Sequence, residues 1–311
     1  MQGLSLPDRI RAVIDDTLLA VILARLSTAL ARPAVAYLPL LVDGYAAGWL
    51  TPERAARLSK FSNVFTVRRQ TLELVHALGS EHSRTAALDA VVRTLATEGL
   101  LTQWRNESYA VAPAFGGPVL FHVERAAARF FGIVTYAAHV NGIVARDDDL
   151  CLWLARRSPD KSIDPGQLDN LVGGGIRAGA TVMETVRREA WEEAGIADSI
   201  AARAQPVGAV QLCREQPDGL QREVIFVHDV RLADNFTPNG VDGEAVDHRL
   251  ATFAEAAALI AHVEGPLQTT ADASLVILDC LIRHGAIHAD SPHYLPLVAL
   301  RVSSLEIGSS A

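Results

Sequence analysis

Apolar residues recur along the chain at spacings typical of helices. The segment 17–31 (TLLAVILARLSTALA) is almost wholly apolar, and we expect it to be buried as part of a helix over 7–31. It is too short to span a bilayer and Arg25 interrupts it, which argues against a membrane segment or a signal sequence. Further helices are expected at 83–98, where Gly99 follows as a terminator, and at 254–262 and 271–284.

Alternating and continuous apolar runs predict the strands. Residues 36–42 and 45–50 flank Asp43-Gly44, a pair typical of a hairpin turn. Thr51-Pro52-Glu53 then predicts the start of a short helix, because proline favours the first helical turn. Further extended segments are expected at 65–74, 104–112, 133–145, 150–156, 207–214 and 223–232, and a loop is expected at 158–175.

Strands and helices occur on both sides of residues 113–118 (PAFGGP), the segment that most resembles a linker. We therefore predict two domains, a smaller α/β domain over 1–125 and a second domain over 126–311. The mixture of elements places the fold in the α/β class, in the wider sense that includes α+β.

Composition and charge narrow the range of possible functions. Half of the 311 residues are apolar, enough for a proper core, and the formal net charge of −8 argues against a partner that is a nucleic acid polymer. A small anionic substrate is compatible with the negative net charge, because arginines and a bound cation can make the local electrostatic potential positive. The cysteines are scattered without C-x-x-C spacing, which favours a reducing, cytoplasmic location and argues against disulfides and structural zinc: Cys151, Cys213 and Cys280.

The most specific pattern lies between Thr181 and Gly195. Thr181, with Glu184 three residues later, predicts a capping box and a helix that begins at Val182. Gly195 is the expected left-handed residue just past the end of this helix. One apolar stripe would face the core: Val182, Val186, Ala190 and Ala194.

Three carboxylates crowd one edge of that stripe. Glu189 and Glu193 lie one turn apart, and Glu192 lies beside them. A like-charged pair at this spacing costs roughly 0.2–0.5 kcal/mol on an exposed helix, and more where water is displaced. A divalent cation would remove the repulsion, and ligands that are all oxygen suit Mg²⁺ or Mn²⁺. The alternative is a solvated acidic face.

Neighbouring residues could organise such a site. Arg188 is expected to pair with a helix carboxylate and hold it in one rotamer. Glu184, one turn earlier, is either that partner or only the acid of the capping box, and both alternatives stay open. Gly174 and Gly175 lie in the glycine-rich loop just upstream, where backbone N–H groups could bind a diphosphate.

Other candidates lie on neighbouring segments. Arg156, Arg157 and Lys161 form a basic cluster that suits phosphate groups, with a solvated basic loop as the alternative. Asn141 and His139 lie on the same side of a predicted strand. Each could contact the substrate, and the alternative is a hydrogen-bonded position in the core. Glu244 lies in an acidic loop beside Gly243, a sequence that by itself predicts only a turn.

Residues 174–196 (GGIRAGATVMETVRREAWEEAGI) resemble the Nudix box of the Nudix hydrolases, G-x5-E-x7-R-E-U-x-E-E-x-G-U, in which U is apolar. One position departs, because the first glutamate of the box falls on Ala180. Glu184, one helical turn later, is the nearby acid that could substitute for it. The residues that match the dense part of the box are Arg188, Glu189, Glu192, Glu193 and Gly195.

The likeness extends over roughly 33–290 and points to a branch related to plastid Nudix enzymes and to the Nudix half of fungal thiamine pyrophosphokinase fusions. Residues 267–270 (LQTT) depart from a Phe-Lys-Pro-Asn-like stretch of that branch, which puts ligand contacts at this segment in doubt. The segments that carry the likeness are 104–107 with Tyr109, 124–125, 139–142, 152–158, 165–170, 242–244 and 281–285.

The resemblance implies an α/β/α sandwich with a mixed sheet, preceded by the smaller domain. It implies Mg²⁺-dependent hydrolysis of a small organic diphosphate to a monophosphate and phosphate, with Glu244 joining Glu189, Glu192 and Glu193 as a metal ligand or as the base that activates water. Damaged thiamine diphosphates are the implied substrates, and damaged nucleoside diphosphates such as 8-oxo-dGDP are the alternative. A ligand sensor of the same fold without turnover is the alternative of another class. The first domain is expected to shape the pocket, to form a homodimer, or only to stabilise the second.

Overall fold

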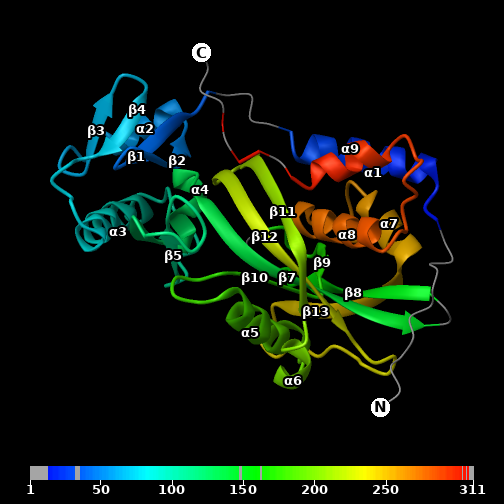
Figure 1. Ribbon diagram of the computed structural model, residues 1–311. Coiled ribbons are helices and arrows are strands. Elements are labelled where there is room, and N and C mark those ends of the chain that lie inside the picture. The colour runs from blue at the N-terminus through cyan, green and yellow to red at the C-terminus, as the bar shows by residue number, and fades with distance from the viewer. Residues whose placement is uncertain are drawn as a thin grey trace.

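The computed structural model describes residues 13–31, 36–146, 149–161, 163–302, 304–305 and 307, and these form two units side by side (Figure 1). The smaller unit combines a four-stranded sheet, a two-stranded sheet and two helices. Its elements are β1 (Leu38–Val42), β2 (Tyr45–Leu50), α2 (Pro52–Leu58), β3 (Phe65–Arg68), β4 (Thr71–Leu74), α3 (Glu81–Thr97), β5 (Ser108–Val111) and β6 (Phe121–Glu124).

Local signals account for most of the smaller unit. The expected hairpin is confirmed, since β1 and β2 pair antiparallel across Asp43-Gly44, and the short helix α2 is capped by Thr51 as expected. The extended segment 65–74 is two paired strands, because a turn containing Arg69 at φ 50° divides it. The helix expected at 83–98 begins earlier, at Glu81, because Ser80 provides its N-cap. Parallel pairing of β1 with β4 completes the sheet order β2-β1-β4-β3.

The larger unit is a mixed sheet between two layers of helices. Its main path has the order β11-β12-β7-β8-β13, in which β12 and β7 run parallel and the other neighbours antiparallel. The strands are β7 (Val134–Arg146), β8 (Asp149–Arg157), β9 (Leu168–Asn170), β10 (Val172–Gly175), β11 (Gln205–Gln216), β12 (Gly219–Arg231) and β13 (Ala245–Thr252). The helices are α1 (Asp16–Ala29), α5 (Val182–Ala194), α6 (Asp198–Ala201), α7 (Phe253–Ile260), α8 (Ala271–Arg283) and α9 (Tyr294–Leu300).

Each face of this sheet has its own core. The apolar stripe of α5 packs with buried side chains of β7 and β10 on one face. On the other face, α1, α7, α8 and α9 cover a second apolar cluster that includes residues of β8, β11 and β12. Strand β7 is buried along most of its length because it is covered on both faces. This arrangement is the expected α/β/α sandwich, and the predicted fold class is confirmed.

Helix α1 packs with the larger unit, although the smaller unit follows it in the chain. Leu19, Ile22 and Leu26 are fully buried in the cluster that α7 and α8 share, which confirms a buried helix within the expected range 7–31. The helix begins only at Asp16, because Asp15 is its N-cap, and the expected part at 7–12 lies outside the described residues. Arg25 anchors it by donating to the carbonyl oxygens of Ile260 and Thr269. The domain boundary at residue 125 stays a prediction. None of the helices in the described ranges is long and apolar enough to cross a membrane.

The prediction of a loop over 158–175 is wrong for part of this segment. Its second half contains β9, which pairs with β8, and β10, which pairs with β7. Several further elements were not predicted, among them strand β6, the short helix α6, the edge strand β13 and the helix α9. The expected helices at 254–262 and 271–284 correspond to α7 and α8.

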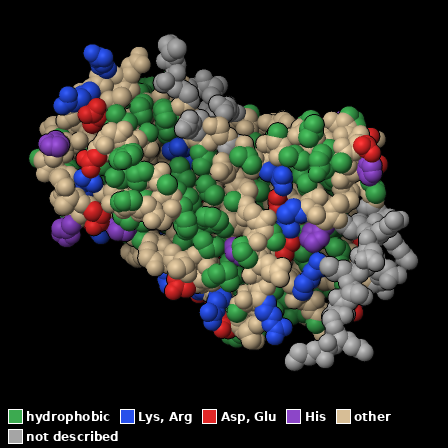
Figure 2. Space-filling model, viewed as in Figure 1, with side chains coloured by type: hydrophobic (Ala, Val, Ile, Leu, Met, Phe, Trp, Pro, Cys, Tyr) green, Lys and Arg blue, Asp and Glu red, His purple; other side chains and the backbone are tan. Residues whose placement is uncertain are grey.

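The two units meet along β2, β12 and a short helical segment, η1 (Arg125–Ala127) followed by α4 (Ala128–Phe131). Arg222 of β12 donates to the carbonyl oxygen of Gly132 at 2.9 Å, across this junction. Hydrophobic side chains gather over the same junction on the surface that Figure 2 shows. A groove there is lined by residues of both units, including Trp49 and Tyr136.

Candidate active site

The helix that carries the candidate acids forms as its local sequence dictates. Thr181 and Glu184 make the reciprocal capping box, with the Thr181 N–H donating to Glu184 Oε2 at 2.7 Å. Gly195 ends the helix in the left-handed region at φ 62°. Val186, Ala190 and Ala194 are buried. The carboxylates beside that stripe are thereby fixed against the sheet.

The glycines upstream of the helix lie in strand β10, not in a loop. A Cβ atom at Gly174 would collide with the Glu189 carboxylate, and one at Gly175 would collide with the Tyr109 hydroxyl. The glycines therefore let the strand approach these groups closely. The N–H of Gly173 donates to Glu193 Oε2 at 2.8 Å, so this backbone donor binds a carboxylate of α5.

Arg188 joins two of the acids. Its guanidinium donates to Glu189 Oε1 at 2.6 Å and to Glu192 Oε2 at 2.8 Å. It therefore pairs with Glu189 and Glu192 and not with Glu184, whose carboxylate is used by the capping box. Glu184 is exposed at the start of the helix.

Two of the acids bear a charge that their surroundings disfavour. The Glu189 residue is 8% exposed, and burial raises the pKa of its carboxyl to about 7 despite the neighbouring Arg188. Burial also raises the pKa of Glu193 well above its ordinary value, and the nearby Glu189 adds to the rise. The two groups cannot both ionise easily at neutral pH without additional positive charge.

Glu244 reaches the same region from a distant part of the chain. The loop before it packs on the end of α5, where the N–H of Val241 donates to the carbonyl oxygen of Glu192 at 2.7 Å. Its carboxylate forms an ion pair with Lys161. Burial opposes the ionisation of Glu244, but Lys161, with Arg105 and Arg125, holds its pKa below the ordinary value. Lys161 also favours the ionised form of Glu193.

The remaining predicted residues hold other polar contacts. Arg156 donates to the carbonyl oxygens of Gly166 and Pro266, at 3.0 and 2.6 Å. Arg157 donates to Asp169 Oδ2 at 2.7 Å and to the carbonyl oxygen of Ile163. Both arginines thus brace the segment between β8 and β9. Substrate binding by them stays a prediction.

The two candidates on β7 also have protein partners. Asn141 is buried and donates to Asp229 Oδ1 at 3.0 Å. His139 lies 2.8 Å from Asn170 Oδ1 through its Nδ1 atom. Both contacts suit hydrogen-bonded core positions, and a substrate contact of Asn141 stays a prediction.

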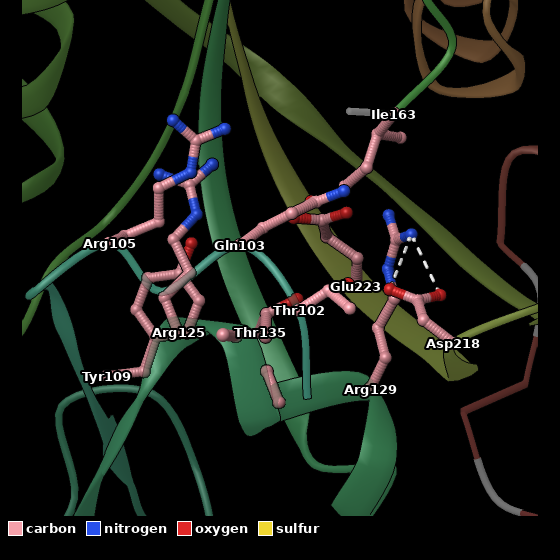
Figure 3. A pocket seen from close by; sticks show the side chains of 12 residues that line it. Thr102, Gln103, Arg105, Tyr109, Arg125, Arg129, Thr135, Ile163, Asp218 and Glu223 are labelled. Carbon is pink, nitrogen blue, oxygen red and sulfur yellow. Dashed lines mark hydrogen bonds and ion pairs between the residues drawn. The ribbon is translucent and has the colours of Figure 1, made fainter. Parts of the chain in front are cut away.

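A cavity of about 110 Å³ lies between the two units, beside β10 (Figure 3). Arg105, Tyr109 and Arg125 line it from the smaller unit and the segment that follows, and Glu223 lines it from β12. The hydroxyl of Tyr109 lies against Gly175, and the preceding residue, Gly174, lies against the Glu189 carboxylate. Tyr109 therefore lies between the cavity and the strand that contacts the acids. Sequence reasoning noted residues 104–107, Tyr109 and 124–125 only as part of a resemblance and gave them no role.

Comparison with known proteins identifies the family of the chain. Residues 23–135 match a domain of unknown function (DUF4743), and residues 135–272 match the NUDIX domain. Nudix hydrolase 24, chloroplastic, of Arabidopsis thaliana is 38% identical over 266 residues, which cover 84% of this chain and 71% of the relative. The chain belongs to the Nudix hydrolase family.

A second plant relative supports the same family, and similar solved structures are also known. Nudix hydrolase 20, chloroplastic, of Arabidopsis thaliana is 36% identical over 272 residues, with the same shares of both chains covered. A crystal structure from Deinococcus radiodurans is 25% identical and has a TM-score of 0.43; the match covers 55% of this chain and 97% of that one. The predicted resemblance and the assignment as a hydrolase are confirmed.

Nudix hydrolases generally use a divalent metal ion. Glu189, Glu192, Glu193 and Glu244 offer only oxygen ligands, and the pKa values of Glu189 and Glu193 are raised, so these residues fit a hard cation such as Mg²⁺. Their ligand atoms do not converge as a ready-made cage. Within the described residues, the one group of three potential ligand atoms that lie within 4.8 Å of one another is Asp229, Cys280 and His284.

Proposed function

We propose that this Nudix hydrolase cleaves a small organic diphosphate with Mg²⁺, or with Mn²⁺ in its place, and releases a monophosphate and phosphate. The observation that carries the proposal is a pair of neighbouring carboxyl groups, that of the buried Glu189 and that of the half-buried Glu193. The positive charge around them is not enough to ionise both easily. Structural ion pairs usually come with their counter-charge, so a missing counter-charge indicates a site that takes one up.

The residues of the site would divide the work. Glu189, Glu192, Glu193 and Glu244 would hold the cation, which would neutralise phosphate charge and lower the pKa of an attacking water when bound. Arg188 would keep Glu189 and Glu192 in one orientation, as it does in the structure. Lys161 would keep Glu244 ionised and pointed at the site.

We propose damaged thiamine diphosphates as the substrates, on the basis of the likeness to the thiamine-linked branch. The acidic chain as a whole would not attract a nucleic acid polymer, whereas the local arginines suit a small anion. Damaged nucleoside diphosphates are the comparison class in the test below.

The test is a panel of diphosphates with detection of released phosphate. It would contain oxidised thiamine diphosphate, intact thiamine diphosphate, 8-oxo-dGDP and dGDP, each with Mg²⁺ and with excess chelator. The proposal expects Mg²⁺-dependent phosphate release, fastest for the oxidised thiamine compound, and a monophosphate as second product. Binding of these compounds without any turnover would instead identify a ligand sensor. Turnover of 8-oxo-dGDP alone would keep the reaction and overturn the thiamine assignment.

A further inference from the structure

The cavity between the two units contains two arginines that the site described above does not use. Arg105 lies between α3 and β5, and Arg125 follows β6, so both are held by the smaller unit and its last strand. Figure 3 shows their guanidinium groups pointing to the same side of the cavity. A third arginine, Arg129, also lines the cavity but is paired with Asp218 at 3.4 Å.

Most of the N–H donors of the two guanidinium groups have no partner among the described residues. In the ranges that the structure describes, Arg105 is held through its backbone N–H, which donates to Glu124 Oε1 at 3.0 Å, and its guanidinium has no hydrogen bond or ion pair. Arg125 uses one N–H on Glu107, at 3.0 Å, and lies over the Tyr109 ring at 5.8 Å. A guanidinium has five N–H donors, so most remain available to a ligand.

The other cations near the acids are already engaged. Arg188 is committed to Glu189 and Glu192, and Lys161 to Glu244. A diphosphate beside these acids would meet repulsion that one metal ion only partly offsets. Its charge needs further cations, and the fork of an arginine matches phosphate oxygens in pairs.

The arginines also lie close to the strand that faces the acids. Tyr109, which lines the cavity, packs its hydroxyl against Gly175 of β10, and the neighbouring Gly174 lies against the Glu189 carboxylate. The cavity therefore adjoins the part of β10 that faces the acids of α5.

We propose that Arg105 and Arg125 bind a phosphate group of the substrate, so that the smaller unit completes the active site of the larger one. This inference rests on the proposed diphosphate hydrolysis. It gives the first domain a role, since without it the site would lack the cations that hold the diphosphate next to the metal ligands.

The experiment measures binding and turnover separately in the full chain. R105A, R125A, R105K and R125K are compared with wild type for KM and kcat on the best diphosphate of the panel, and for the Kd of inorganic pyrophosphate with Mg²⁺ by calorimetry. R68A is the matched control, because Arg68 lies on β3 at the far edge of the smaller sheet and pairs with Glu73. Each alanine variant is expected to raise KM and Kd together by roughly ten- to a hundredfold, with a smaller effect on kcat.

Lysine keeps the charge without the fork, so the lysine variants should lie between wild type and alanine. Values of KM and Kd for R105A and R125A equal to those of R68A would overturn the proposal, as would a loss confined to kcat. If R125A does not fold, R105A decides, because its guanidinium has no contact in the described structure to lose. If wild type turns over no diphosphate, the hydrolysis proposal fails, and the pyrophosphate titration still decides whether the two arginines bind phosphate.

Discussion

Two buried acids of the same sheet sandwich show opposite behaviour. The side chains of Glu189 on α5 and Asp229 on β12 are almost equally exposed, at 11% and 12%. Burial raises the pKa of Glu189 to about 7, whereas the pKa of Asp229 lies well below its ordinary value. Burial alone therefore does not set the charge, and the difference lies in the partners.

Asp229 is surrounded by donors. Arg283 donates to both of its carboxylate oxygens, at 2.7 and 3.0 Å, and Asn141 and His284 add contacts at 3.0 and 3.2 Å. Arg283 also pairs with Asp279, which Arg301 holds from the other side. This network is complete within the protein, so the nearness of Cys280 and His284 to Asp229 gives no reason to place a metal ion there.

The acids of α5 share a single arginine and one backbone N–H. The repulsion among these acids occurs in a helix that has a complete capping box, a buried apolar stripe and a terminal glycine. Local rules are commonly broken where a protein binds something else. The comparison thus separates a group whose charge is neutralised within the protein from a group that, under the proposed function, a bound cation would neutralise.

The largest expected effect follows from removing one of the α5 acids. E193Q should lower kcat by about 10³-fold or more, because a metal ligand is lost while the amide oxygen can still accept from Gly173. The same change removes a carboxyl group whose ionisation the folded state disfavours, so the metal-free variant should melt at a higher temperature than wild type. Steady-state kinetics and thermal unfolding check both. An unchanged kcat in a folded variant would contradict the assignment of Glu193.

Removing Asp229 should have the opposite effect on stability. Asp229→Ala leaves Arg283 without its main partner on β12, and the free energy of unfolding should fall by roughly 3 to 4 kcal/mol. Urea denaturation measures the change. A loss below about 1 kcal/mol would mean that this network contributes no more than a surface ion pair.

The pH dependence of stability should distinguish the two groups in the metal-free protein. The raised pKa of Glu189 means that the folded state keeps a proton from about pH 4.5 to about 7 that the unfolded state has lost, so stability falls as pH rises through this range. Glu189 contributes roughly 3 kcal/mol to this fall at most, and the raised pKa of Glu193 adds to it in the same direction. Asp229 has a lowered pKa, so its contribution is present above about pH 4 and is lost on acidification.

Urea denaturation with chelator at a series of pH values measures both slopes. E189Q is the control, because it has no carboxyl group to titrate at this position and should make the fall between pH 4.5 and 7 shallower. A wild-type slope that E189Q leaves unchanged would assign the effect to other groups.

Much of the fold was predictable because its signals are local. Helix α5 was predicted to the residue, since its capping box, apolar stripe and terminal glycine are contiguous in sequence. Strands β9 and β10 were missed because their pairing partners lie far away, and glycine-rich segments do not suggest strands. Edge strand β13 was missed because most of its residues are polar or partly exposed and show no clear alternation.

The site residues were likewise predictable where their signals are local in sequence. The acids of the box and Arg188 lie on one helix, so their spacing alone brought them together. Arg105 and Arg125 approach from the other unit, and no periodicity in sequence could indicate that. The basic pair Arg156 and Arg157 suggested phosphate binding by composition, while the structure gives both arginines carbonyl partners and gives Arg157 the Asp169 carboxylate as well.

The smallest expected effect concerns Glu184, the acid next to the box position that Ala180 occupies. E184A removes half of the capping box, so unfolding free energy should fall by about 1 kcal/mol while kcat stays within about twofold of wild type. Helix α7 supplies a matched control, because Thr252 and Glu255 form the same box with nearly the same distances. E255A should cost the same stability. If E184A lowered kcat more than tenfold and E255A did not, Glu184 would act in the site and replace the missing glutamate, because a shared loss of helix capping cannot produce that difference.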